Sequence, residues 1–87
     1  YNPVDLAGLA HLKFVSIHPF GDGNGRISRL IMNWILYRRG YPMFIIEYKN
    51  RSSYYSALER AQIKNNSFMF LSWFLRNYTR FLRRESK

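Results

Sequence analysis

The sequence predicts an all-α fold, a small bundle of about four helices, with a glycine-rich loop between the first and second helices. Apolar residues recur three or four positions apart along most of the chain, and Gly, Pro and Asn separate these segments. A length of 87 residues is enough for a single domain spanning 1–87, and 47% hydrophobic and 18% aromatic residues can supply its core. This composition excludes an intrinsically disordered or collagen-like chain.

The first helix is expected to begin at Asn2 and to end near residue 17 or 18. Asn2 can cap a free amide, and Pro3 fits the first helical position. Pro19 disfavours helical geometry at the residue before it, which places the end of the helix. The apolar stripe predicted for this helix consists of Leu6, Ala10, Phe14 and Ile17.

The second helix is predicted over residues 27–39, and Gly40 followed by Pro42 ends it. Its apolar residues surround most of the helix, so we expect it to be central and buried. The short apolar run 43–48 that follows is predicted to be irregular.

Two more helices are expected in the second half of the chain. The polar cluster 50–53 starts the third helix, whose apolar positions are Tyr54, Leu58 and Ala61, and residues 65–67 interrupt the pattern. The fourth helix has a predicted apolar face of Leu71, Phe74, Leu75, Tyr78, Phe81 and Leu82. Its basic side is formed by Arg76, Arg80, Arg83 and Arg84.

The charge balance narrows the class of partner. Fourteen Lys and Arg against five Asp and Glu give a formal net charge of +9, which favours an anionic ligand or surface. The absence of Cys excludes a disulfide framework, a thiolate zinc site and a cysteine nucleophile. Apolar runs are far shorter than the about 20 residues that span a bilayer, so we expect a soluble protein without a membrane partner. We further expect a cytoplasmic location.

The segment 18–29, HPFGDGNGRISR, concentrates residue types that bind phosphate. Its glycines allow successive amides of Gly23, Asn24 and Gly25 to point into one concavity, which is an anion-binding nest. The helix that follows adds unpaired amides and a partial positive charge. Arg26 and Arg29 are three residues apart, so both guanidiniums can bind phosphate oxygens from one helix face.

Two further residues of this segment predict catalysis. Asp22 would repel an anionic ligand unless a cation such as Mg²⁺ lay between them, so it is a candidate metal ligand. His18 can accept a proton at physiological pH and is the candidate base. A phosphate nest, a metal ligand, a base and two arginines are what phosphoryl and nucleotidyl transfer require.

This segment resembles the signature loop of Fic-domain (Fido-fold) proteins, HPFx(D/E)GNGRxxR, with every specified position filled. The flanking runs LAHLKFVSIHPF, RLIMNWILYRRGYP and RSSYYSAL are similar to the family's surrounding helices. The resemblance implies a protein adenylyltransferase, which moves AMP from ATP, with Mg²⁺, to a Ser, Thr or Tyr hydroxyl of a target protein. Some members transfer other phosphate-containing groups or remove AMP, and these activities are the first alternative.

The resemblance also assigns roles in the signature loop. It makes His18 the base that deprotonates the attacking hydroxyl, and Asp22 the ligand that holds Mg²⁺ against the α- and β-phosphates. The anion hole would be formed by Gly23, Asn24 and Gly25. Arg26 would stabilise the β-phosphate region, Arg29 would hold the outer phosphate or brace the loop, and Phe20 would anchor the loop from inside.

Residues outside the loop are implied by the same resemblance. Tyr54 and Tyr55 align with tyrosines that line the nucleoside pocket, although tyrosines at helical spacing are also common in cores. Gln62 falls where some relatives have an adenine-contacting Asn. The flap that docks the target and the helix that carries an inhibitory Glu lie upstream in many relatives, and both are expected to be absent from these residues. His11 is interpreted as a structural histidine or a support of the loop.

A second alternative is a non-catalytic module that binds nucleic acid through the basic side of the fourth helix. Such a side is usually only the solvated face of an amphipathic helix, so nucleic acid is the less favoured partner. A catalytically silent interaction domain is disfavoured by the intact loop. The sequence leaves the formation of homo-oligomers open.

Overall fold

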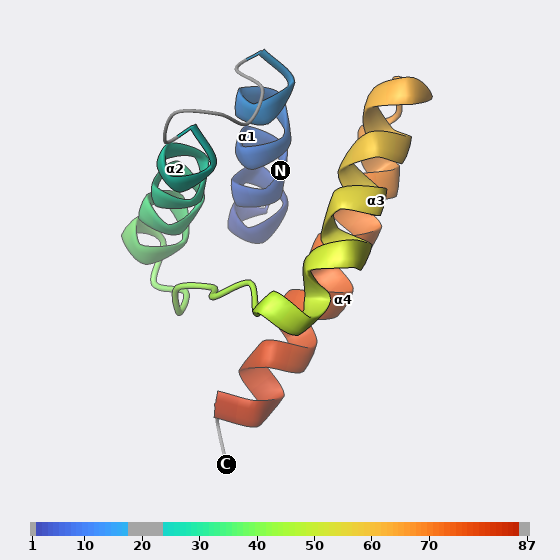
Figure 1. Ribbon diagram of the computed structural model, residues 1–87. Helices are drawn as coiled ribbons and strands as arrows, with labels where there is room; N and C mark the ends of the chain where they lie inside the picture. Colours follow the sequence, from blue (N-terminus) through green and yellow to red (C-terminus); the bar gives the residue numbers. More distant parts are fainter. Residues whose placement is uncertain (1, 18–23, 86–87) are drawn as a thin grey trace. The chain divides into compact units, whose positions relative to one another are not determined.

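The computed structural model describes residues 2–17 and 24–85, without the side chains of residues 24 and 85. Its helices are α1 (Pro3–Ile17), α2 (Asn24–Arg38), α3 (Arg51–Ile63) and α4 (Ser67–Glu85), with a 3₁₀ turn η1 (Tyr48–Asn50) before α3 (Figure 1). The described ranges contain no strand, and the predicted all-α class with four helices is confirmed.

The chain divides into two compact units, Tyr1–Met43 and Phe44–Lys87. In the first unit α1 packs against α2, and in the second α3 packs against α4. The second pair forms an antiparallel hairpin with a short turn (Figure 1). Residues 41–47 have no regular secondary structure, which agrees with the irregular run predicted there.

The start of α1 is capped as the sequence predicted. The side-chain oxygen of Asn2 accepts a hydrogen bond from the backbone amide of Asp5 at 2.9 Å. The predicted apolar stripe, however, is wrong. Leu6, Ala10 and Phe14 are only half-buried and Ile17 is 72% exposed, while the buried residues are Val4, Ala7, Gly8, His11, Leu12 and Val15.

The helix α2 begins at Asn24, three residues before the predicted start, so Gly25 and Arg26 are helical. Its buried side carries Ser28, Met32 and Leu36, spaced four residues apart. The opposite side, which we call the outer face of α2, consists of Ile27, Leu30, Trp34 and Tyr37, and all four are exposed. The expectation that this helix is buried nearly all round is therefore wrong.

The C-terminal ends of α2 and α3 are each followed by a residue in the left-handed backbone region. Gly40 has φ +81°, and the amide of Tyr41 reaches the carbonyl of Leu36 at 2.9 Å, which ends α2. Asn65 has φ +51°, and the amide of Asn66 reaches the carbonyl of Ala61 at 2.9 Å, which ends α3. The predicted stops at residue 40 and at 65–67 are confirmed.

Aromatic rings form most of the core of the second unit. Phe44 lies 5.5 Å from Phe74, 5.3 Å from Tyr78 and 5.4 Å from Phe81 between ring centroids, so the irregular segment before α3 is packed against α4. The predicted apolar face of α4 needs a correction at three positions. Phe70 and Trp73 are also buried, and Leu75 is 38% exposed.

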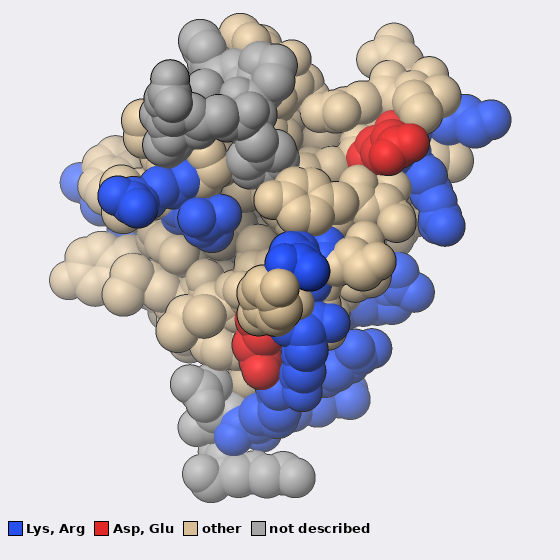
Figure 2. Space-filling model, viewed as in Figure 1, with Lys and Arg blue, Asp and Glu red and all other residues tan. Residues whose placement is uncertain are grey.

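The basic side of α4 is solvent-exposed, as the sequence predicted. Its residues are Arg76, Arg80, Arg83 and Arg84, and Figure 2 shows Lys and Arg side chains gathered along the α3–α4 pair. The guanidinium of Arg84 donates a hydrogen bond to the carboxylate of Glu47 and lowers the pKa of that carboxyl. In the parts of the chain that the structure describes, no helix has both the length and the apolar character needed for a membrane crossing.

Candidate active site

The site predicted from the sequence lies where α2 begins. His18, Phe20, Asp22 and Gly23 are outside the described residues, so the structure gives the candidate site from the backbone of Asn24 onward. The first four amides of an α-helix have no acceptor within the helix, and in α2 they include the amides of Asn24 and Gly25, the last two residues of the predicted nest. The start of α2 thus carries helix-end amides and the positive end of the helix dipole.

Two arginines flank this helix start. Arg26 and Arg29 are both exposed and lie three residues apart in α2, so their side chains leave the helix on one side. No carboxylate of the described residues is within ion-pair distance of either guanidinium. Guanidiniums in such positions are suited to binding an anion at a helix start.

A buried contact supports the same turn from behind. His11 of α1 is fully buried and hydrogen-bonds to the backbone of Ser28, whose hydroxyl donates to the carbonyl of Gly25 at 2.8 Å. Burial lowers the pKa of His11 to about 4; the bond to Ser28 opposes this shift, and the charge of Arg29 adds to it. His11 is therefore neutral at pH 7 and has a structural position next to the candidate site.

The predicted nucleoside-pocket residues lie on α3, in the second unit. Tyr54 is 3% exposed and its ring packs 5.4 Å from that of Trp73, so it belongs to the aromatic core. Tyr55 is 46% exposed, and Gln62 is exposed two helical turns later on the same side of α3. Tyr55 and Gln62 therefore share one side of α3, while Tyr54 is part of the core.

A metal ion at the candidate site would depend on few protein ligands. The described residues include no cluster of three or more His, Asp, Glu or Cys that could hold a metal by itself. Mg²⁺ commonly binds through one or two carboxylates, with substrate phosphates and water as its other ligands. Asp22, which the signature supplies two positions before α2 in the sequence, stays a predicted ligand of such a shared site.

Comparison with known proteins identifies the family. The sequence profile of the Fic/DOC family matches residues 1–36, which include the whole signature loop. A Fic/DOC segment therefore makes up the start of this chain. It is 54% identical over 61 residues to "Protein adenylyltransferase Fic" of Aedes aegypti, and 58% identical over 60 residues to the proteins of the same name from Drosophila virilis and Drosophila melanogaster.

The matches with these relatives cover most of this chain but little of each relative. They include 69–70% of the chain and 12% of the length of the Aedes and Drosophila proteins. The chain thus spans about an eighth of those relatives, and the family resemblance stated from the signature is confirmed.

One structural link near the start of α2 could not be predicted from the sequence. Ser28 stands within the signature as an unspecified position, yet it is fully buried and connects His11 to Gly25. The only sequence signal is its spacing of four from Met32 and eight from Leu36, which places it on the buried side of α2.

Proposed function

We propose that the protein that carries this chain is a nucleotidyltransferase, which transfers AMP from ATP to a Ser, Thr or Tyr hydroxyl of a target protein. The observation that carries this proposal is the start of α2 inside the signature loop. It joins helix-end amides, the positive helix end and two exposed arginines in the same short stretch of sequence as the candidate base. The name of the Aedes and Drosophila relatives supports the same activity.

In this proposal the phosphates of ATP lie against the amides of Gly23, Asn24 and Gly25. Arg26 and Arg29 bind the oxygens of the outer phosphates, which become the leaving pyrophosphate. Asp22 would hold Mg²⁺, which would supply positive charge against the charge that develops on the leaving group.

His18 is the proposed base. It removes the proton of the target hydroxyl as that oxygen forms a bond to the α-phosphorus of ATP, and the bond between the α-phosphorus and the bridging oxygen breaks. AMP is then esterified to the target and pyrophosphate leaves. His11 does not act as a base here, because its pKa of about 4 and its burial remove it from substrate.

Residues of α3 are proposed to select the nucleoside. Tyr55 offers an exposed ring for stacking, and the amide of Gln62 offers a donor and an acceptor for the edge of adenine. Phe20 is proposed to anchor the loop. We place the reaction in the cytoplasm, with ATP and a target protein as partners, without a nucleic acid or a membrane, and with homo-oligomers left open.

The decisive experiment follows the label of ATP. The protein that carries this chain is incubated with Mg²⁺, a cell lysate and ATP labelled at either the α- or the γ-phosphate, and a His18→Ala variant serves as the control. Label from α-phosphate alone, lost in the variant, is expected. Label from γ-phosphate alone shows phosphorylation, and loss of label from AMP-modified proteins shows AMP removal; either result contradicts the proposal.

A further inference from the structure

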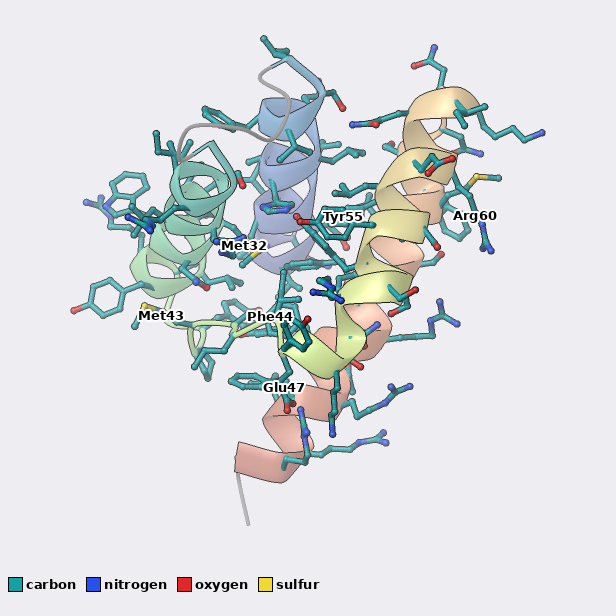
Figure 3. The ribbon with its side chains drawn as sticks, in the orientation of Figure 1. Met32, Met43, Phe44, Glu47, Tyr55 and Arg60 are labelled. Atoms are coloured by element: carbon teal, nitrogen blue, oxygen red, sulfur yellow. The ribbon has the colours of Figure 1, made fainter. Side chains whose placement is uncertain are left out.

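A groove between α3 and α4 belongs to no part of the candidate active site. It has a volume of about 550 Å³ and is formed entirely within the second unit. Arg60 of α3 and Arg76 of α4 are in its wall. It opens on the other side of α3 from the proposed nucleoside contacts, and Figure 3 shows Tyr55 and Arg60 leaving α3 in opposite directions.

The two arginines converge along the groove. Arg60 lies three residues before the end of α3 and Arg76 nine residues after the start of α4, which separates their levels by about 9 Å at 1.5 Å per residue. Side chains lean toward the N-terminus of their own helix, and α3 and α4 are antiparallel. Arg60 therefore leans away from the turn and Arg76 leans toward it.

Hydroxyl groups lie between the two guanidiniums. Ser56 of α3 and Ser72 of α4 line the groove at levels between those of Arg60 and Arg76. Neither arginine has a carboxylate of the described residues within ion-pair distance. The described lining also includes no Asp or Glu. Two positive charges and two hydroxyl donors match a dianion with several oxygen atoms. A single carboxylate has one negative charge and two oxygens, so it matches this set less well.

The end of the groove near the turn is apolar. Phe68 is 70% exposed there, and Met69 beside it is half-buried. Exposed aromatic and thioether groups next to an anion-binding position favour a ligand whose anionic group is attached to an aromatic or apolar stem.

We propose that the groove between α3 and α4 binds a phosphate monoester carried on an aromatic group, with the phosphate between Arg60 and Arg76 and the ring against Phe68. This site is separate from the proposed ATP site and does not depend on nucleotidyl transfer. Binding here attaches a phosphorylated molecule to the second unit without any chemical step.

Trp73 provides the reporter for the test. Its indole nitrogen donates a hydrogen bond to the hydroxyl of Ser53 at 3.0 Å, and both residues line the groove. The chain has two Trp residues, so a Trp34→Phe background leaves one indole N–H signal in a ¹⁵N NMR spectrum. Phenyl phosphate is titrated into this chain, and a saturable shift of that signal is expected.

The variants decide whether the two arginines bind the phosphate. Arg60→Gln with Arg76→Gln is expected to weaken phenyl phosphate binding at least tenfold, because each charge-assisted hydrogen bond contributes strongly. Arg39→Gln with Arg80→Gln removes the same charge from exposed positions outside the described groove lining and is expected to change the affinity less than twofold. Equal weakening in both pairs, or no saturable shift, overturns the proposal.

Further titrations test the role of the aromatic ring, the source of the phosphate and the independence of this site from the proposed active site. Phe68→Ser is expected to weaken phenyl phosphate binding but not the binding of inorganic phosphate, and equal affinity of both probes overturns the role of the ring. Arms with AMP and with a phosphotyrosine peptide distinguish a nucleotide from a protein side chain as the source of the phosphate. Arg26→Ala is expected to leave the Trp73 response unchanged, so failure of the proposed transferase activity is distinguishable from failure of this site.

Discussion

His11 of α1 hydrogen-bonds to the backbone of Ser28 near the start of α2, and both residues are fully buried. Burial keeps the imidazole neutral by lowering its pKa from 6.5 to about 4. In the unfolded chain the same group takes up a proton near pH 6.5. The unfolded state thus binds more protons between these values, and stability falls as pH falls through this window.

We expect the free energy of unfolding to be highest above pH 6.5 and to decrease toward pH 4, by about 3 kcal/mol from this group. Urea unfolding followed by circular dichroism at a series of pH values measures the slope. His11→Gln keeps a hydrogen-bond donor but does not titrate, so its slope should be smaller. A His18→Ala variant tests the other histidine, and an unchanged slope in His11→Gln contradicts the assignment.

The Trp73–Ser53 hydrogen bond gives a second prediction, about stability. Ser53→Ala leaves the indole N–H of a 4% exposed Trp73 without its acceptor, and we expect a loss of about 1–2 kcal/mol. Ser52→Ala, at an exposed neighbouring position, is the control and should change stability by less than about 0.5 kcal/mol. Chemical denaturation measures both, and equal effects would show that the hydrogen bond contributes nothing specific.

Gly40 gives a prediction about backbone conformation alone. A Cβ added there meets no heavy atom within 4 Å, but its φ of +81° is unfavourable for other residues. Gly40→Ala should therefore cost about 1 kcal/mol, and Gly40→Asn should cost less because Asn tolerates the left-handed region. Thermal unfolding of the two variants tests this order, and the reverse order contradicts it.

Binding and chemistry at the proposed active site can be separated by two substitutions. His18→Ala should abolish transfer but leave ATP affinity nearly unchanged, because a base acts on the attacking hydroxyl. Arg26→Ala should weaken both ATP binding and transfer, because its guanidinium is proposed to bind phosphate. Calorimetry and the labelled-ATP assay measure the two properties. Most of the activity remaining in the histidine variant excludes it as the base.

Dependence on a divalent cation tests Asp22. Mg²⁺ should tighten ATP binding to the native protein, and Asp22→Asn should remove this enhancement while metal-free binding stays equal or improves slightly. Calorimetric titrations of both proteins with Mg²⁺ and with a chelator give the four affinities. The same magnesium enhancement in both would show that other groups hold the ion.

The periodicity of apolar residues predicted the helices but not always their buried sides. In α1 the buried side includes Ala7 and Gly8, one turn before His11, which contacts α2. Small residues on this side allow close approach of a neighbouring helix, and a hydrophobic pattern gives them little weight. Phe14, which has a larger apolar side chain, is only half-buried. The distance between α1 and α2 thus determines which side of α1 is buried, and this distance is a property of the tertiary structure.

The residues of the candidate site could be predicted because they are close together in the sequence. Arg26 and Arg29 could be placed on one side of a helix because three-residue spacing fixes that relation. The spacing of Tyr54 from Leu58 and Ala61 places Tyr54 on the apolar side of α3 and leaves Tyr55 off it, and the packing of Tyr54 against Trp73 agrees with this prediction. The groove of α3 and α4 depends on residues from two helices, and no single stretch of sequence shows it.

The outer face of α2 makes ionic strength a determinant of colloidal behaviour. Ile27, Leu30, Trp34 and Tyr37 are exposed on a molecule of net charge +9, so mutual repulsion opposes the meeting of these faces between copies. The Debye length falls from about 10 Å at 0.1 M salt to about 3 Å at 1 M, and the repulsion shrinks with it. Added salt therefore promotes adhesion between molecules, and dilute buffers keep them dispersed.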